Sequence, residues 1–419
     1  MRSSRFWFRR VAAGLAITLG LSTTSVGTSV ATSVDAGSST IASSPVSASF
    51  LSSGEGWILT GYHCAMALCV AVKKTENDGT SWTKLPLPSE LRTVASPTTS
   101  SYFPLVQQNV YFANANDGWI YGAREPGDVA DTSYTYDAEI WSTHDGGATW
   151  SDVDTKALGM QDNVVTMSAS RGWVYAISWR GDTFGLWRSP VSTDAWRRVT
   201  TPTLHSAAGG SDMEGALIFK GDHGWLMLGN DRGVTASARM TDAGRWVTWN
   251  SPCDSVGGGF AVPVATSATS LVDVCTIGGF GDHVARGTPP YLKLQSNWVF
   301  TSHNAGLTFT ATSQVVADGS SAYLDWLASL PASPGRYSII VAKAQSHGMK
   351  TSDHLYLTQN GGQTWRSVFA TPLMSFFPVI QFVTFASSHL GYAIVETSAT
   401  TSELIISSNG GAMWHPVDS

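Results

Sequence analysis

The chain has 419 residues and a formal net charge of −6, and only 13% of its residues are charged. This small charged share leaves little material for long solvent-facing helices, and a mildly acidic chain lacks the basic face that nucleic-acid binding requires. The 41 glycines and 17 tryptophans instead favour a structure made of turns and buried aromatic rings.

Residues 1–45 differ in composition from the rest of the chain. Four arginines, at positions 2, 5, 9 and 10, precede the short apolar run Val11–Leu21, and a Ser/Thr-rich tract continues to Pro45. This order is typical of a secretory signal peptide and a flexible spacer, and the apolar run is too short for a membrane span. We therefore expect a secreted or extracytoplasmic protein with no integral membrane span after cleavage. It would be membrane-tethered if the leader is retained.

From residue 46 onward, a phrase of glycine, an aromatic residue and an apolar run recurs, and a further apolar stretch precedes it. The phrase begins at Gly56, Gly118, Gly172, Gly224 and Gly391. Short β-rich runs separated by turn signals predict strands. Each unit is therefore expected to hold an apolar strand, the glycine-aromatic strand, and two further strands joined by a tight turn.

That tight turn has its own phrase, Ser/Thr-x-Asn/Asp-x-Gly-x-x-Trp/Phe, in the five repeat turns 75–82, 143–150, 302–309, 358–365 and 407–414. The Asn or Asp is expected to bond backbone N–H groups, the Gly to adopt a positive φ, and the aromatic ring to wedge between neighbouring sheets. Turn chemistry accounts for all of these residues, so we interpret them as structural. They are Asn77, Gly79, Trp82, Asp145, Gly147, Trp150, Asn304, Gly306, Phe309, Asn360, Gly362, Trp365, Asn409, Gly411 and Trp414.

Two degenerate turns, ending at Trp196 and Trp246, bring the count of units to seven. Four strands per unit and a spacing of about 55 residues predict an all-β, seven-bladed β-propeller with four antiparallel strands per blade. Because a single blade cannot bury its faces alone, residues 46–419 are expected to form one domain, and we expect a monomer. Six or eight blades would follow if a degenerate unit is misread.

Four cysteines fit an exported protein, since an even number in an oxidising compartment suggests disulfides. Of the three possible pairings, we expect Cys64–Cys69 and Cys253–Cys275. No Cys/His spacing resembles a zinc site, and we expect neither a metal nor a cofactor.

A binding site is expected on the face opposite the repeat turns, because loops on a rigid scaffold carry function and the longest inserts fall there. These inserts are Ser89–Pro104, Ala123–Ala138, Gly278–Tyr291 and Lys343–His354. Their aromatic, His and Arg side chains could stack on a sugar or contact a protein. The candidate ligand-binding residues are Tyr102, Tyr134, Tyr136, His283, Arg286 and Tyr291.

The phrase of the repeat turns resembles the Asp-box, or BNR repeat. This repeat is shared by sialidases, some glycoside hydrolases, sortilin-type receptors and photosystem II assembly factors. The combination of Gly-Trp with Thr-x-Asp/Asn-Gly-Gly-x-Thr-Trp is most similar to the photosystem II assembly-factor type of propeller, with WD40/YVTN/BNR-like repeats. The resemblance covers Val46 to Ser419 and implies the fold. It carries over no binding residues, because no motif places them.

From these features we expect a secreted, non-catalytic propeller that binds a protein or glycan partner, with no nucleic acid and no catalytic residues. The alternative is an exported glycoside hydrolase, sialidase-like or polysaccharide-cleaving, that uses paired carboxylates in the central cleft. The chain lacks the Arg-Ile-Pro phrase that a sialidase would carry. Four acids lie near the relevant strand ends, and the sequence does not show which of them would pair: Asp162, Glu214, Asp325 and Glu396.

Overall fold

The computed structural model describes the chain in sixteen segments. They are 43–64, 67–95, 108–124, 137–160, 162–180, 183–204, 214–230, 233–253, 263–277, 296–314, 324–329, 339–347, 350–360, 363–373, 379–398 and 401–418. The residues expected to form the signal peptide and most of the spacer therefore lie outside the described ranges, which begin at residue 43.

Strands account for almost all regular structure in these segments, and they form seven antiparallel sheets, each from consecutive strands. The first sheet holds β1 (Ser44–Phe50), β2 (Gly56–Cys64), β3 (Ala67–Thr75), β4 (Thr83–Lys84) and β5 (Thr93–Ala95). The second holds β6 (Gln108–Phe112), β7 (Gly118–Arg124), β8 (Asp137–Thr143) and β9 (Ser151–Asp152). The third holds β10 (Asn163–Ser170), β11 (Trp173–Arg180), β12 (Thr183–Pro190) and β13 (Arg197–Val199).

The remaining sheets follow the same order. The fourth holds β14 (Glu214–Lys220), β15 (His223–Asn230), β16 (Gly233–Met240) and β17 (Trp246–Thr248). The fifth holds β18 (Val264–Ala265), β19 (Leu271–Ile277), β20 (Ser296–Ser302) and β21 (Thr310–Gln314). The sixth holds β22 (Leu324–Ser329), β23 (Ile339–His347), β24 (Lys350–Thr358) and β25 (Arg366–Ala370). The last holds β26 (Val379–Phe385), β27 (Gly391–Ser398), β28 (Thr401–Ser407) and β29 (His415–Val417). Two one-turn helices, α1 (Ser89–Arg92) and α2 (Thr155–Leu158), complete the described elements.

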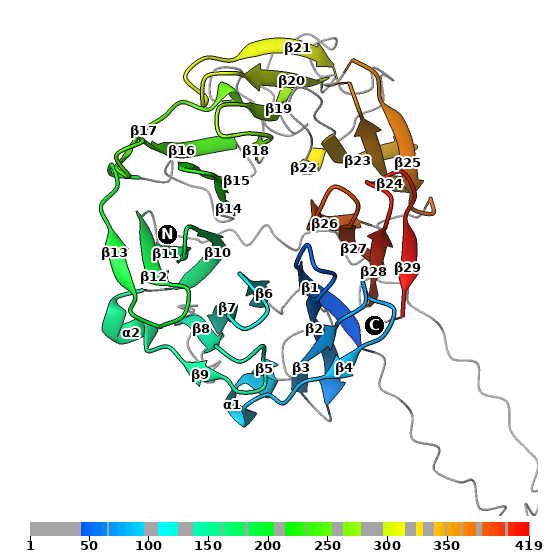
Figure 1. Cartoon of the computed structure of the whole chain (residues 1–419). Helices are drawn as coiled ribbons and strands as arrows, with labels where there is room; N and C mark the ends of the chain where they lie inside the picture. The colour runs from blue at the N-terminus through cyan, green and yellow to red at the C-terminus, as the bar shows by residue number, and fades with distance from the viewer. Residues whose placement is uncertain are drawn as a thin grey trace, which may run out of the picture.

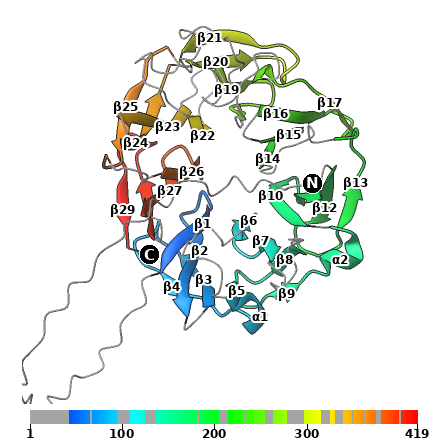
Figure 2. The same ribbon diagram turned by 180° about the vertical axis from the view of Figure 1, so that it is seen from behind.

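The sheets stand around a ring, with the first strand of each sheet innermost and the last on the outside (Figures 1 and 2). Each sheet contacts the next, and the last sheet contacts the first. The ring closes where the backbone N–H of Phe50 donates to the Tyr392 hydroxyl at 3.3 Å and the Ser402 hydroxyl donates to the Pro45 carbonyl. The chain is therefore an all-β propeller of antiparallel blades, which are four-stranded except for the first sheet with its added β5.

The hydrophobic core lies between neighbouring sheets. One cluster joins Trp57 and Val72 of the first sheet to Phe112 and Trp141 of the second, and comparable clusters join most later pairs. A single sheet would leave these side chains in water, so the blades stabilise one another by burying both faces.

Side chains of one blade also accept hydrogen bonds from backbone N–H groups in the innermost strand of the next blade. The hydroxyls of Ser47 and Ser49 accept the backbone N–H groups of Val110 and Phe112 at 3.1 and 2.9 Å. Asp353 accepts the N–H of Ile380 in the same way at 2.7 Å. An inner strand has no further strand on its open side, so these bonds pair backbone groups that would otherwise be unsatisfied in a buried place.

The glycine of the glycine-aromatic phrase has a steric role. A Cβ atom on Gly118 would stand 2.4 Å from the Phe112 ring, and a Cβ on Gly56 would stand 2.3 Å from Phe50. The Phe ring therefore lies over the glycine and meets the aromatic residue of the repeat turn edge to face. Ring centroids are 6.2 Å apart for Phe112 and Trp150. The same arrangement recurs in three other sheets, in the pairs Phe50–Trp82, Phe219–Trp246 and Phe385–Trp414.

The repeat turns have the hydrogen bonds expected from their residues. In the first, the Thr75 hydroxyl accepts the N–H of Gly79 at 3.0 Å, and Asn77 accepts the N–H of Ser81 at 2.9 Å. The second, fifth and last sheets repeat these bonds around Asp145, Asn304 and Asn409. Gly79, Gly147, Gly306 and Gly411 all have φ between 80° and 95°. Gly362 lies outside the described residues.

Three details differ from the sequence expectations. β1 begins at Ser44, so the end of the expected spacer belongs to the first sheet, where the Pro45 carbonyl helps to close the ring. Part of the first expected insert, Ser89–Pro104, forms α1 and β5, because β5 pairs with β3. The insert expected at Lys343–His354 is a long hairpin, since β23 and β24 pair from Ile339↔Thr358 to His347↔Lys350.

Candidate functional site

The propeller presents two different faces. Each repeat turn that can be traced lies against the turn between the first two strands of its own sheet, for example where Gly146 N–H donates to the Asn116 carbonyl at 2.8 Å. These two kinds of turn share one face. The connections between blades, and those between second and third strands, therefore emerge on the opposite face, which includes the ends of β7 at Arg124 and of β8 at Asp137.

All six candidate ligand-binding residues fall outside the described ranges: Tyr102, Tyr134, Tyr136, His283, Arg286 and Tyr291. The four acids proposed for the enzyme alternative all lie on described segments, near strand ends on the opposite face. Asp162 precedes β10, Glu214 is the first residue of β14, Asp325 is the second residue of β22, and Glu396 lies near the end of β27.

A buried carboxylate that sequence reasoning missed lies near this face. Glu139 of β8 is only 6% exposed, and it accepts from the Gln108 side-chain amide at 2.6 Å and from the Trp141 indole at 2.9 Å. Gln108 and Glu139 both pair with Gly122 of the strand between them, so the two side chains meet across a residue that has none. In the last sheet the Gln381 amide likewise donates to Glu396. These acids bond neighbouring strands together, which is a structural use of a carboxylate.

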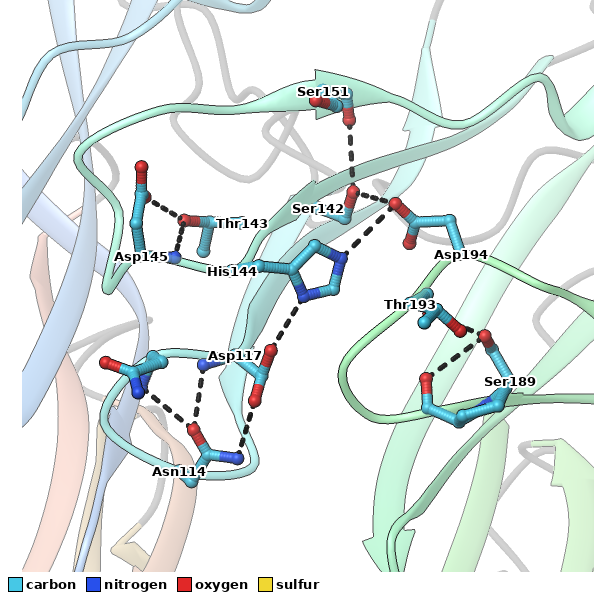
Figure 3. Close-up of polar contacts among 12 residues, drawn as sticks. Asn114, Asp117, Ser142, Thr143, His144, Asp145, Ser151, Ser189, Thr193 and Asp194 are labelled. Atoms are coloured by element: carbon cyan, nitrogen blue, oxygen red, sulfur yellow. Dashed lines mark hydrogen bonds and ion pairs between the residues drawn. The ribbon is translucent and has the colours of Figure 1, made fainter.

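The face of the repeat turns carries the polar cluster shown in Figure 3. His144 of the second repeat turn lies between two carboxylates, with Nδ1 at 2.7 Å from Asp117 and Nε2 at 3.4 Å from Asp194 of the third sheet. The Ser142 hydroxyl donates to the same oxygen of Asp194 at 2.7 Å. Among the described residues, the Ser142 hydroxyl bonds this carboxylate and the Ser151 carbonyl and no ring nitrogen, whereas a nucleophile–base pair requires a hydroxyl bonded to the base. The cluster joins the second and third blades.

At other boundaries between neighbouring sheets, a tryptophan indole of one sheet donates a hydrogen bond to the repeat turn of the next, and the His144 cluster stands in place of that bond. The Trp57 indole donates to the Gly146 carbonyl in the next repeat turn at 3.0 Å, and the Trp225 indole donates to Ala305 at 3.1 Å. The third sheet has a degenerate turn, and Nε1 of the fully buried Trp119 finds no acceptor in the described structure. Asp194, from that degenerate turn, supplies the polar contact to the second blade instead.

The His144 junction predicts a pH dependence of stability. Partial burial lowers the pKa of His144, but hydrogen bonds to Asp117 and Asp194 outweigh it and raise the pKa above its usual value. A raised pKa in the folded state stabilises the fold below the unfolded pKa of about 6.5, and this contribution is lost as the pH rises through the folded pKa. We expect His144→Gln to lower the free energy of unfolding at pH 6 but hardly at pH 9, by at most about 1 kcal/mol because solvent screens the pair.

The matched control for this measurement is His303→Gln. His303 occupies the same position in the fifth sheet's repeat turn and is exposed. Urea denaturation of both variants and the parent at the two pH values decides the matter. Equal losses at pH 6 and pH 9, or an equal effect of the control, would contradict the assigned role of His144.

Disulfides join Cys64 to Cys69 and Cys253 to Cys275, the two pairs expected from the sequence. The first links β2 to β3, and the second links the segment after β17 to β19. Asp273 lies beside the second pair, but sulfur atoms bonded to each other are not available as thiolate ligands for a metal. The disulfides indicate an oxidising, extracytoplasmic environment. Neither of the two described helices has the length and apolar character of a membrane span.

Comparison with known proteins supports the architecture. No family model matches the chain, and no curated protein matches it. Among solved structures, an ulvan lyase described as a new family of polysaccharide lyase aligns with a TM-score of 0.54 at 9% identity, covering 90% of this chain and 96% of its own. YCF48 bound to a D1 peptide aligns with a TM-score of 0.50 at 14% identity, covering 88% and 93%. At such identities the similarity shows the propeller fold alone, which hosts unrelated functions.

Proposed function

We propose that this chain is an exported propeller that binds a protein or glycan partner, without catalysis, through the face opposite the repeat turns. Each sheet, the five-stranded first one included, counts as one blade, which makes seven blades. The repeat turns are interpreted as Asp-boxes of the photosystem II assembly-factor type, and residues 1–45 as the leader and spacer. Neither the residues of the repeat turns nor residues 1–45 supply the binding chemistry.

The observation that carries this proposal is the bonding of the acids near the opposite face. Glu139 is buried and accepts from Gln108 and Trp141, and Glu396 accepts from Gln381. A glycosidase needs two carboxylates that face each other across a cleft, one of them ready to donate or accept a proton. Carboxylates that bond adjacent strands within a sheet favour a scaffold, and the inserts that begin and end on this face favour recognition by loops.

The test uses the insert between β7 and β8. Arg124 and Asp137 are register partners, so residues 125–136 can be replaced by Asn-Gly, which closes a two-residue hairpin. We expect the full exported chain to retain a ligand on a glycan array or in a pull-down from the extracellular fraction, and the replaced variant to lose it. The matched control replaces residues 181–182, between the register partners Arg180 and Thr183 on the same face, by Asn-Gly.

The same proteins decide between binding and catalysis. A panel of aryl glycosides and polysaccharides is expected to show no turnover. Turnover that is lost in Glu396→Gln or in Glu139→Gln would establish the glycoside hydrolase alternative. Ligand retention that is unchanged by removal of the insert would overturn the assignment of this face.

A further inference from the structure

Two arginines of the third sheet form an unusual pair. Arg188 of β12 and Arg197 of β13 are register partners in neighbouring strands. Both guanidinium groups lie over the ring of Trp173 in β11, with their central carbons 4.5 and 4.8 Å from its centroid. Trp173 and Arg188 are half-buried, whereas Arg197 is exposed. β13 is on the outside of the ring (Figures 1 and 2). These residues lie toward the repeat-turn face, because Trp173 begins β11, Arg188 is near the end of β12 and Arg197 begins β13.

This arrangement holds two positive charges together, and neither forms an ion pair with an acid of the described segments. Arg171, in the turn between β10 and β11, pairs with Asp222 of the next sheet. Lys74 pairs with Glu55, and Lys156 pairs with Asp137. For Arg188 and Arg197, no ion pair with a described residue is present. Like charges opposite each other on adjacent strands destabilise a sheet, and arginine cannot relieve this by losing its proton. The indole of Trp173 offsets part of the repulsion by cation–π attraction.

We propose that Trp173, Arg188 and Arg197 form a binding site for the carboxylate or sulfate group of an acidic glycan. Guanidinium groups bind such oxyanions through two parallel N–H donors. Two arginines that are register partners and lie over the same ring can both donate to one oxyanion. Trp173 is only half-buried, so its indole can contact a sugar ring beside the two guanidinium groups. An acidic sugar uses all three side chains, whereas the carboxylate of an acidic peptide uses the two arginines alone.

Nucleic acid is a poorer fit for this site. A protein that binds the phosphate backbone of DNA makes about 6–10 phosphate contacts, many more than two arginines supply. This chain is also acidic overall. The proposed site is also distinct from the face opposite the repeat turns, so it does not depend on the function proposed above. The variant that lacks residues 125–136 should keep it.

The experiment measures retention of the exported chain by dextran sulfate and by polygalacturonate in affinity electrophoresis, with neutral dextran as the blank. We expect the double variant Arg188→Gln/Arg197→Gln to bind both acidic polymers about tenfold more weakly or worse, which corresponds to about 1.4 kcal/mol. Arg366→Gln is the matched control, because Arg366 is exposed and directly follows the turn aromatic residue Trp365, as Arg197 follows Trp196. The control is expected to bind like the parent.

The variant Arg188→Lys/Arg197→Lys keeps both charges and removes the planar donors. It is expected to lose a smaller part of the affinity, and it decides the question if the glutamine variant fails to fold. The proposal is overturned if the parent chain does not bind either acidic polymer, or if Arg366→Gln weakens binding as much as the double variant. Stronger retention by polyglutamate than by both glycans would assign the site to acidic peptides and overturn the glycan proposal.

Discussion

Gly118→Ala is expected to destabilise the propeller by about 2–4 kcal/mol, because the new methyl group would overpack a core that cannot yield. Its Cβ would lie 2.4 Å from the Phe112 ring. That ring is stacked on Trp57 with centroids 3.7 Å apart and meets Trp150 edge to face on another side, so it has no room to retreat. Urea denaturation followed by tryptophan fluorescence measures the loss.

The control for this prediction is Gly244→Ala. Gly244 has a φ of +74°, and its added Cβ would meet no atom within 4 Å. This substitution therefore costs the left-handed backbone strain alone, about 1 kcal/mol. In the background of Phe112→Leu, Gly118→Ala should lower the free energy of unfolding by less, because the ring that overlaps the new methyl group is absent. A Gly118→Ala variant no less stable than Gly244→Ala would show that the Phe ring does not require the glycine.

Trp57→Phe is expected to cost at least about 1 kcal/mol more than Trp119→Phe, although both tryptophans are fully buried at equivalent positions of adjacent blades. The Trp57 indole donates to the Gly146 carbonyl, and its loss leaves that carbonyl without its partner. Nε1 of Trp119 has no acceptor in the described structure, so removing it also removes an unpaired buried donor. Both substitutions leave a cavity of the same kind, which the comparison cancels.

Thermal and urea unfolding of the two variants, with Trp225→Phe as a second donor-removing case, measure this difference. The Trp225 indole donates to Ala305 in the same way, so this variant should resemble Trp57→Phe. Equal losses for Trp57→Phe and Trp119→Phe would mean that the indole-to-turn bond does not stabilise the seam. The contrast between intact and degenerate turns would then have no energetic consequence.

The architecture was open to prediction because its determinants are local and repeated. The hydroxyl, the amide or carboxylate and the glycine of each repeat turn bond to near neighbours along the chain, and the alternation of turns and apolar runs sets the strands. The pairing of the cysteines followed from their proximity along the chain or within one blade. The glycine of the glycine-aromatic phrase was recognised as a marker, but its reason, the Phe ring that covers it, became visible only when the strands were paired.

The candidate sites were less predictable, since their members come from different strands or blades. No spacing in the chain connects His144 with Asp194, or Gln108 with Glu139, which meet across a glycine of the strand between them. The proximity of the two arginines is likewise hidden in the sequence, because Arg188 and Arg197 meet only when β12 and β13 pair in one register. The signal that could have found the arginines was two basic residues on either side of a predicted tight turn.

The chain by itself determined how each blade is built, because turn chemistry and the period of apolar residues act over a few residues at a time. The tertiary structure decided which blades touch, which carboxylates are bonded to neighbours and which cations have no acidic partner within the described segments. Those properties depend on distances between residues far apart along the chain, and the burial that sets their energies exists only once the ring has closed.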